Sequence, residues 1–463
     1  MLIGTMLAYF ALVVAIGVIA ERRTESSDDF MLGGRRTGPW VAAIGAAASS
    51  SSAWTLLGVS GAAYAWGLSA LWLFPACVGG FALNWFLLAP AVRDYGHREN
   101  ATSVPDILGR DSSLTRIYSA LLILVSMSAY VAAQYQGAGK TFSVVFGIAP
   151  ETAVLIGAAA VLAYTMLGGF VAVSLTDTLQ GVVMGVTALV LPVAALVQVG
   201  GVSPLIESLQ GVEQAGFLSL GGPRPALLGL GFAAGLLGIG LGYPGQPHVV
   251  KYFLAMDQTP GSIRRARAIA LTWATVVYGG MLLLGLCGRA LFPALADREI
   301  VLVKVAEAVA HPVLAGIMLS AVLAAIMSTA DSQLLVAAGA VTGDLRLGKG
   351  KRLWAIRGTI LGLSVVAVSA ALLGTEEIFS AVLFGWAAMG AGFAPGLLLR
   401  VVLRRQLTPV AMGTLVIVGS SLAVLGHVVA RGDLRNVFIH VVPISIAFAI
   451  GLAWSSPSTV ASR

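Results

Sequence analysis

Thirteen apolar stretches, each long enough to cross a lipid bilayer as a helix, follow one another along this chain. Only 11% of the 463 residues are charged, whereas soluble domains carry about 25%. Because the links between the stretches are short, residues 1–463 are predicted to form one all-α, polytopic transmembrane domain in a lipid bilayer. The stretches lie near residues 2–20, 39–65, 68–92, 114–146, 151–168, 171–199, 226–254, 266–292, 311–340, 355–373, 377–400, 407–430 and 436–455.

The basic residues are divided unequally between the two sets of links. If the N-terminus lies outside, the inside segments hold 21 of the 28 Lys and Arg residues and the outside segments hold six, while Lys140 falls within a span. Cytoplasmic loops carry such an excess of positive charge. The pattern predicts an N-terminus outside and a C-terminus in the cytoplasm, and it explains the net charge of +7 without a nucleic-acid partner.

Four consecutive serines, Ser49–Ser52, interrupt the second apolar stretch within Gly45–Gly58. A hydroxyl in hydrocarbon needs a partner, usually a backbone carbonyl one turn back, and that bond weakens the helix. We therefore predict a broken helix whose freed carbonyls and hydroxyls line a site at mid-membrane depth. The alternative is a seam of small residues where helices pack closely.

A second break is predicted in the seventh stretch, where Pro244 and Pro247 stand among four glycines in residues 238–248. The two breaks are five spans apart. Interrupted helices at matching positions of two inverted halves indicate a transporter site, although unrelated kinks would give the same pattern. The predicted organisation is an extra helix and loop at 1–38, five-helix repeats at 39–200 and 201–402, and two C-terminal helices at 403–463.

Two further stretches carry oxygen atoms that suit a hard cation. Asp177 lies in the sixth stretch, where an acid is costly and by default functional; alternatively, it is solvated at the cytoplasmic end. Ala325, Ser328 and Thr329 share one face of the ninth stretch and offer three neutral oxygens, which can hold a monovalent cation. The alternative for this trio is that the hydroxyls bond to their own helix.

Other polar residues could orient a small solute, and they stand near the breaks. Tyr130 and Gln134 share a face of the fourth stretch, and Tyr243 and His248 lie in the second break. No zinc-protease, phosphate-loop or dinucleotide motif is present, and the histidines show no ligand spacing, so no enzymatic activity is expected.

Four segments of the chain resemble, in order, the sodium:solute symporter family: GAAASSSSAW, GGFVAVSLTDTLQG, GYPGQPHVVKYFLA and LSAVLAAIMSTADSQLL. The resemblance implies a LeuT-type fold, an inverted five-helix repeat with one additional helix before it and two after it. It implies that sodium is the coupling ion, bound by Ala48, Ser51, Ala325, Ser328 and Thr329, with Asp177 at a further cation site or on the exit route. The positions that the resemblance places near the solute are Ser52, Ala53, Tyr130, Tyr243 and Pro247.

The resemblance also implies a sodium-coupled importer of a small organic solute, proline or a similar amino acid, in the bacterial inner membrane. A short monocarboxylate or other solute, and a non-transporting sensor with the same fold, remain alternatives. Two positions depart from the family's proline transporters. Ser50 replaces an aspartate, which affects the expected sodium coupling, and Ile239 replaces a tryptophan, which alters the expected solute pocket.

Overall fold

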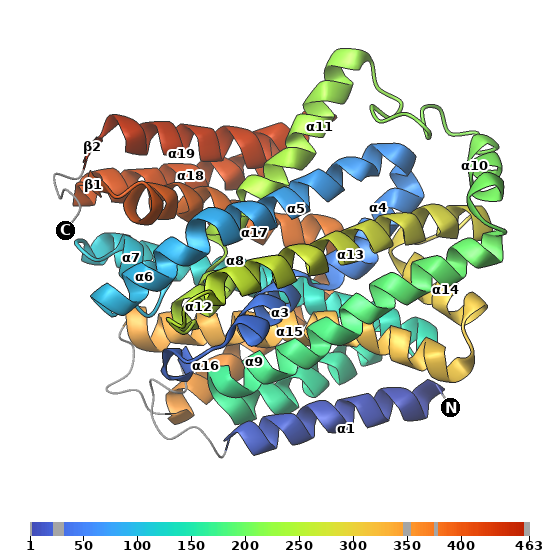
Figure 1. The fold of residues 1–463 in the computed structure, drawn as a ribbon, viewed down its shortest axis with the longest axis horizontal. Helices are drawn as coiled ribbons and strands as arrows, with labels where there is room; N and C mark the ends of the chain where they lie inside the picture. The colour runs from blue at the N-terminus through green and yellow to red at the C-terminus, as the bar shows by residue number, and fades with distance from the viewer. Residues whose placement is uncertain (1, 22–31, 346–352, 375–377, 458–463) are drawn as a thin grey trace.

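The computed structural model describes residues 2–21, 32–345, 353–374 and 378–457. Most of these residues lie in helices that run side by side along the horizontal direction of Figure 1. In the first half the helices are α1 (Leu2–Glu21), α3 (Pro39–Ser50), α4 (Val59–Trp66), α5 (Leu73–Leu83), α6 (Ala89–Glu99), α7 (Val104–Leu108), α8 (Ser113–Phe146), α9 (Pro150–Val199) and α10 (Val202–Gln210). In the second half they are α11 (Ala226–Leu241), α12 (Pro247–Ala255), α13 (Ser262–Leu291), α14 (Val301–Val309), α15 (Pro312–Gly339), α16 (Leu353–Leu373), α17 (Ile378–Leu397), α18 (Pro409–Val429) and α19 (Val442–Ala453).

Short turns of tighter or wider helix adjoin many of these elements. The 3-10 turns are η1 (Gly33–Arg35), η3 (Gly67–Trp72), η5 (Tyr243–Gly245) and η6 (Arg298–Ile300). The π turns are η2 (Trp54–Gly58), η4 (Asn84–Leu88), η7 (Ala340–Asp344), η8 (Leu398–Val402) and η9 (Val437–Val441). Such turns occur often at functional sites and hinges, and η2 and η5 adjoin the two predicted breaks.

Within the described residues, nine helices are long and apolar enough to cross a membrane, and three shorter apolar helices accompany them. This confirms a multi-pass membrane protein. Every predicted stretch coincides with helix, but thirteen crossings remain a prediction. The stretches 151–168 and 171–199 share the label α9, but they are two helical segments that meet at a kink at Gly169, whose φ of 57° and ψ of −168° are not helical. Gly tolerates this backbone because it lacks a Cβ.

Both predicted breaks are present. Helix α3 ends at Ser50, and Ser51 follows with φ −109° and ψ 80°. Helix α11 ends at Leu241, and Gln246 (φ −92°, ψ 107°) precedes the start of α12. The interruptions lie deep inside the protein, because α3 packs against α9, α13 and α15, and the turn η5 packs against α17. Non-helical backbone is tolerated at membrane depth only where it is covered by protein or lines a polar cavity.

The outer surface and the two ends of the helices fit a membrane setting. Large apolar side chains are exposed on the periphery, where lipid would cover them: Leu189, Val193 and Val197 on α9, Leu227 and Leu230 on α11, Val365 and Val366 on α16, and Val428 and Val429 on α18. In Figure 1, α7 and the end of α12 lie at the opposite end of the bundle from α10, as the alternating topology requires. Which end faces the cytoplasm remains a prediction from charge.

One feature of the fold lies outside the all-α prediction. Two short antiparallel strands, β1 (Arg405–Leu407) and β2 (Ser455–Pro457), join the start of α18 to the end of α19. Arg405 Nε donates to Ser455 Oγ at 2.6 Å. The strands are only three residues long, too short to show the alternating pattern that identifies a strand in a sequence.

Close packing around the second break is tested by two neighbouring glycines on α5. A Cβ on Gly80 would lie 2.2 Å from the ring of Tyr243, whereas a Cβ on Gly79 would meet nothing within 4 Å. We expect Gly80→Ala to cost about 1–3 kcal/mol of stability, as overpacking does, and to lower the unfolding temperature in detergent. Gly79→Ala is the matched control and should leave that temperature nearly unchanged. Equal unfolding temperatures for the two variants would contradict the packing described here.

Candidate functional site

The last turn of α3 meets the middle of α15 through side-chain to backbone hydrogen bonds. Ser328 Oγ donates to the carbonyl of Ala48 at 3.2 Å and lies 3.3 Å from the carbonyl of Ala325. Thr329 Oγ1 donates to the carbonyl of Ser49 at 3.1 Å. All five residues have no exposed surface. The structure therefore brings Ala48 next to Ala325, Ser328 and Thr329. Ala48 and Ser328 are 280 residues apart in the sequence.

Ser51 lies beside this group but is not bonded to α15 in the same way. Its backbone N–H donates to the carbonyl of Ala48 at 3.1 Å. The carbonyl that meets Thr329 belongs to Ser49, which the sequence analysis did not select. The sequence could have indicated Ser49, because the last four carbonyls of any helix lack partners within it. Ser49 lies in the last turn of α3, which ends at Ser50. Ser50 itself turns back, with Oγ donating to the carbonyl of Ala47 at 3.0 Å.

The chemistry of this contact is that of neutral oxygen donors. A hydroxyl that donates to a carbonyl still has lone pairs to offer, so Ser328 and Thr329 can contribute to a cation together with the carbonyls of Ala48 and Ser49. Neutral oxygens suit a monovalent cation, whereas Ca²⁺ and Mg²⁺ usually take carboxylates. In the part of the chain that the structure describes, no cluster of three or more His, Cys, Asp or Glu side chains forms a conventional metal site.

Asp177, on α9, contacts α15 one helical turn along from this group, at Ser332. Its Oδ2 accepts from Tyr252 Oη at 2.5 Å and from Ser332 Oγ at 3.0 Å, and Ser332 follows Ser328 by four residues on the same helix face. Asp177 has no exposed surface, which contradicts the alternative of a solvated residue. Among the described residues, its Oδ1 has no hydrogen-bond partner, which leaves one oxygen for a cation. Asp331 is also buried, and its Oδ1 accepts from the backbone N–H of Ser332.

The first break is held by side chains from α8. Tyr130 Oη donates to Ser52 Oγ at 3.4 Å, and the backbone N–H of Ala53 donates to Gln134 Oε1 at 3.0 Å. The N–H of Trp54 in turn bonds Ser52 Oγ at 3.1 Å. Ser52, Ala53 and Tyr130 are thus brought together as predicted, and Gln134 acts as the cap of the second half-helix. Gln134 follows Tyr130 by four residues, and this spacing places both side chains on the same face of α8.

The second break joins the first through a tyrosine that sequence reasoning missed. Tyr278 Oη on α13 lies 2.8 Å from Tyr243 Oη and 3.3 Å from Thr55 Oγ1. The indole of Trp386 packs edge-on against Tyr243 with 4.6 Å between ring centroids, and its Nε1 donates to the carbonyl of Ile239. The indole of Trp386 on α17 therefore lies next to Ile239 on α11. Ile239 is the position where the family resemblance leads us to expect a tryptophan.

Pro247 lies at the start of α12, directly after the second break, and it is fully enclosed. The next residue, His248, places its ring 6.3 Å from that of Tyr130 in an edge-on arrangement. The start of α12, which carries the predicted solute position Pro247, thus lies near Tyr130 on α8. No direct hydrogen bond links Pro247 to the other four positions in the described part of the chain.

The site is covered at the end of the bundle that is predicted to lie outside. Phe379 packs against Trp54 and Trp66, with ring centroids 5.6 and 5.3 Å apart. Phe379 is fixed in turn by Glu299, whose carboxylate accepts from the backbone N–H groups of Ile378 and Phe379 at 3.2 and 2.9 Å. Lys140 on α8 pairs with Glu299 at 2.6 Å and with Asp297 at 2.8 Å. These contacts tie the start of α17 to α8.

Comparisons with known proteins agree with this geometry. A model of the sodium:solute symporter family matches residues 30–419. The sodium/proline symporter of Escherichia coli (strain K12) is 37% identical over 435 residues, covering 89% of this chain and 85% of that protein. The osmoregulated proline transporter OpuE of Bacillus subtilis (strain 168) is 36% identical over 420 residues, covering 86% and 83%.

Two solved structures share the fold. The substrate-bound, outward-open state of a Na⁺-coupled sialic acid symporter gives a TM-score of 0.79 at 18% identity and covers 99% of both chains. A closed conformation of Mhp1, a nucleobase-cation-symport-1 family transporter, gives a TM-score of 0.57 at 13% identity, covering 92% of this chain and 94% of that one. The predicted LeuT-type fold is thereby confirmed.

The cover can be tested through its buried carboxylate. Glu299 is 1% exposed, and Lys140 is 28% exposed. We expect Glu299→Gln to cost about 2–4 kcal/mol, somewhat less than breaking a fully buried pair, because water partly solvates Lys140. Glu307→Gln, which removes the exposed partner of Lys304, is the control and should cost less than about 1 kcal/mol. Thermal unfolding in detergent measures both, and similar losses would show that Glu299 does not hold the cover.

Proposed function

Because this chain belongs to the sodium:solute symporter family, we propose that it couples the inward movement of sodium to the uptake of proline across the bacterial cytoplasmic membrane. It is a transporter and not an enzyme. The relatives named for proline transport support the choice of solute, and they come from bacteria. The structural observation that carries the proposal is the direct contact of Ser328 and Thr329 with the carbonyls at the end of α3.

Sodium would bind at this contact. The carbonyls of Ala48 and Ser49 lie in the last turn of α3, which stops at Ser50, and the hydroxyls of Ser328 and Thr329 approach them from α15. A cation here replaces hydrogen bonds between the two helices by bonds from both helices to one ion. Its binding therefore fixes the distance between α3 and α15. In the proposed set, Ser51 contributes through its backbone, as the family resemblance implies.

Proline would bind beside the ion, between the two breaks. The second half-helices begin at Ala53 and Pro247, and their N-terminal ends favour a carboxylate. Ser52, Tyr130 and Tyr243 supply hydroxyl groups around that position, and the ring of Trp386 supplies an apolar wall. The proposed solute-binding residues are Ser52, Ala53, Tyr130, Tyr243 and Pro247.

Coupling follows from the shared position of the two ligands. Sodium holds α3 to α15, and proline bridges the second half of the first broken helix to the second break. The aromatic cover of Phe379 against Trp54 and Trp66 would separate both ligands from the outside. Asp177 on α9 meets α15 one turn further along, at Ser332, toward the end predicted to face the cytoplasm, and is proposed to receive the cation at a further site or on its exit route.

The proposed function is tested with purified protein in liposomes. An inward sodium gradient should drive accumulation of labelled proline above its equilibrium level, and a sodium ionophore should abolish that accumulation. Unlabelled proline should compete, whereas lactate, a short monocarboxylate, should not. Accumulation blocked by lactate would favour a monocarboxylate carrier, and binding of proline without accumulation would favour a sensor.

The sodium site is tested by removing its hydroxyls. Replacing both Ser328 by Ala and Thr329 by Val should raise the sodium concentration for half-maximal uptake by about tenfold, since about 1.4 kcal/mol of binding energy corresponds to that factor. Ser320→Ala on the same helix is the control, because Ser320 bonds the carbonyl of Gly316 within α15. Asp177→Asn should weaken the sodium dependence in the same titration. An unshifted sodium requirement would remove the altered residue from the proposed site.

A further inference from the structure

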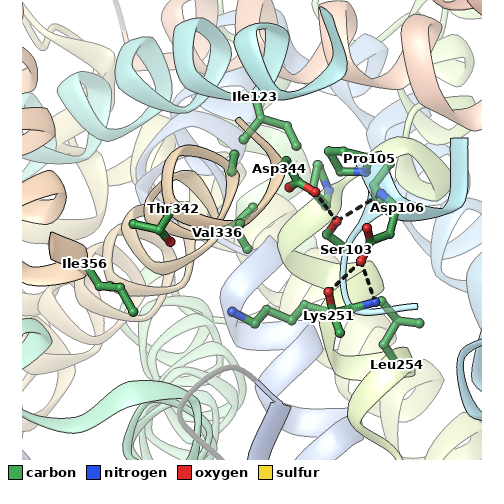
Figure 2. Close-up of a pocket in the computed structure, with 16 residues that line it drawn as sticks. Ser103, Pro105, Asp106, Ile123, Lys251, Leu254, Val336, Thr342, Asp344 and Ile356 are labelled. Carbon is green, nitrogen blue, oxygen red and sulfur yellow. Dashed lines mark hydrogen bonds between the residues drawn. The ribbon is translucent and has the colours of Figure 1, made fainter. Parts of the chain in front are cut away.

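A cavity of about 220 Å³ lies where α12, α8 and the turn η7 meet the segment before α7. Residues of α7 also line it, and α7 lies at the end of the bundle that the charge distribution assigns to the cytoplasm (Figure 1). The cavity has room for several waters or for one small organic molecule. Figure 2 shows that its walls carry both charged and apolar side chains.

Lys251 is the cationic residue of this cavity. Its side chain is 6% exposed, and its Nζ has no hydrogen-bond partner among the described residues. The contact that it does make is with the face of Phe170, 5.6 Å from the ring centroid. Figure 2 shows the side chain extended, with its nitrogen directed away from Asp106 and Asp344. A buried ammonium without an acceptor is costly, and a carboxylate entering the cavity would supply the acceptor.

The opposite wall of the cavity is acidic. Asp344 is 8% exposed and accepts from Ser103 Oγ at 3.0 Å. Asp106 is already engaged, because it accepts from the N–H and hydroxyl of Thr102 and pairs with Arg116 at 3.4 Å. The cavity is thus lined by the side chain of Lys251 from α12, whose ammonium is covered and lacks an acceptor among the described residues, and by a carboxyl from η7. This arrangement favours a molecule with one carboxylate and one ammonium over a dicarboxylate.

The cavity also adjoins the proposed solute site. Pro247 lines it, and Pro247 is one of the residues proposed to contact the solute. Lys251 follows Pro247 by four residues on α12 and so lies on the same face, one turn further from the break. A solute that leaves the central site along α12 therefore meets Lys251 next.

We propose that this cavity is a second, inner binding site for a small zwitterionic amino acid, where Lys251 binds the carboxylate of the solute on its way into the cytoplasm. The inference rests on the proposed function and extends it from one solute site to two in series. Asp344 faces the ammonium group of the same class of solute. The inner site sets the affinity for solute on the cytoplasmic side without contributing to binding from outside.

The test compares the two faces of the membrane. Sodium-dependent proline exchange is measured in right-side-out and inside-out membrane vesicles that contain the full-length protein. Lys251→Met should raise the half-saturating proline concentration about tenfold on the cytoplasmic face and less than twofold on the outer face. Lys251→Arg keeps the charge and should restore the cytoplasmic value. Lys304→Met, which removes an exposed lysine on α14, is the control and should change neither value.

A second measurement applies if Lys251→Met does not fold. Thr342 lines the cavity, and both native cysteines, Cys77 and Cys287, are buried. Proline should slow maleimide labelling of Thr342→Cys in inside-out vesicles, and the same protection should be weaker when Lys251 is replaced by Gln. Lack of protection, or a cytoplasmic half-saturation unaffected by Lys251→Met in a protein that accumulates proline, would overturn the inner site alone. A wild-type protein that accumulates no proline would overturn the proposed function and this inference with it.

Discussion

The structure depends on one constraint: backbone N–H and C=O groups that are shielded from water need hydrogen-bond partners within the protein. At each break inside the membrane, several amides and carbonyls lose their helical partners, and each unpaired group in an apolar setting is costly. The protein satisfies them from neighbouring helices. Gln134 and Ser52 bind the amides that begin the second half of the first broken helix, and Ser328 and Thr329 bind the carbonyls that end its first half. These partners come from α8 and α15, so the break holds three parts of the bundle together.

The same bonds explain how a small ion can affect a large protein. Hydrogen bonds from Ser328 and Thr329 each contribute about 1 kcal/mol net, comparable to the energy needed to change the balance between two conformations of a carrier several-fold. An ion that takes over the carbonyls of Ala48 and Ser49 therefore competes with interactions of similar size. The outer cover is held more strongly, because Glu299 combines an ion pair with two bonds to the start of α17.

Features that depend on local sequence were predictable. The serine run and the Pro and Gly cluster located both breaks, and the spacing of Ala325, Ser328 and Thr329 identified the face of α15 that meets α3. Partners from distant segments were not predictable in the same way. Tyr278 and Trp386 occur in apolar stretches where an aromatic residue is more often ordinary packing, and nothing local distinguishes Glu299 from other loop acids. The boundary between the stretches 151–168 and 171–199 was also predictable, because the glycine pair between them coincides with the kink at Gly169.

Ser50 is neutral and turns its hydroxyl back to its own helix, so it contributes no formal negative charge to the meeting point of α3 and α15. Discrimination among alkali cations would then depend on the number and field strength of neutral oxygens and on how closely the two helices can approach. A larger ion would hold the helices further apart, and a smaller one would draw them together at the expense of their side-chain packing. The distance between α3 and α15 would therefore select the ionic radius that fits. A change in helix packing remote from the oxygens can then alter which cation drives transport.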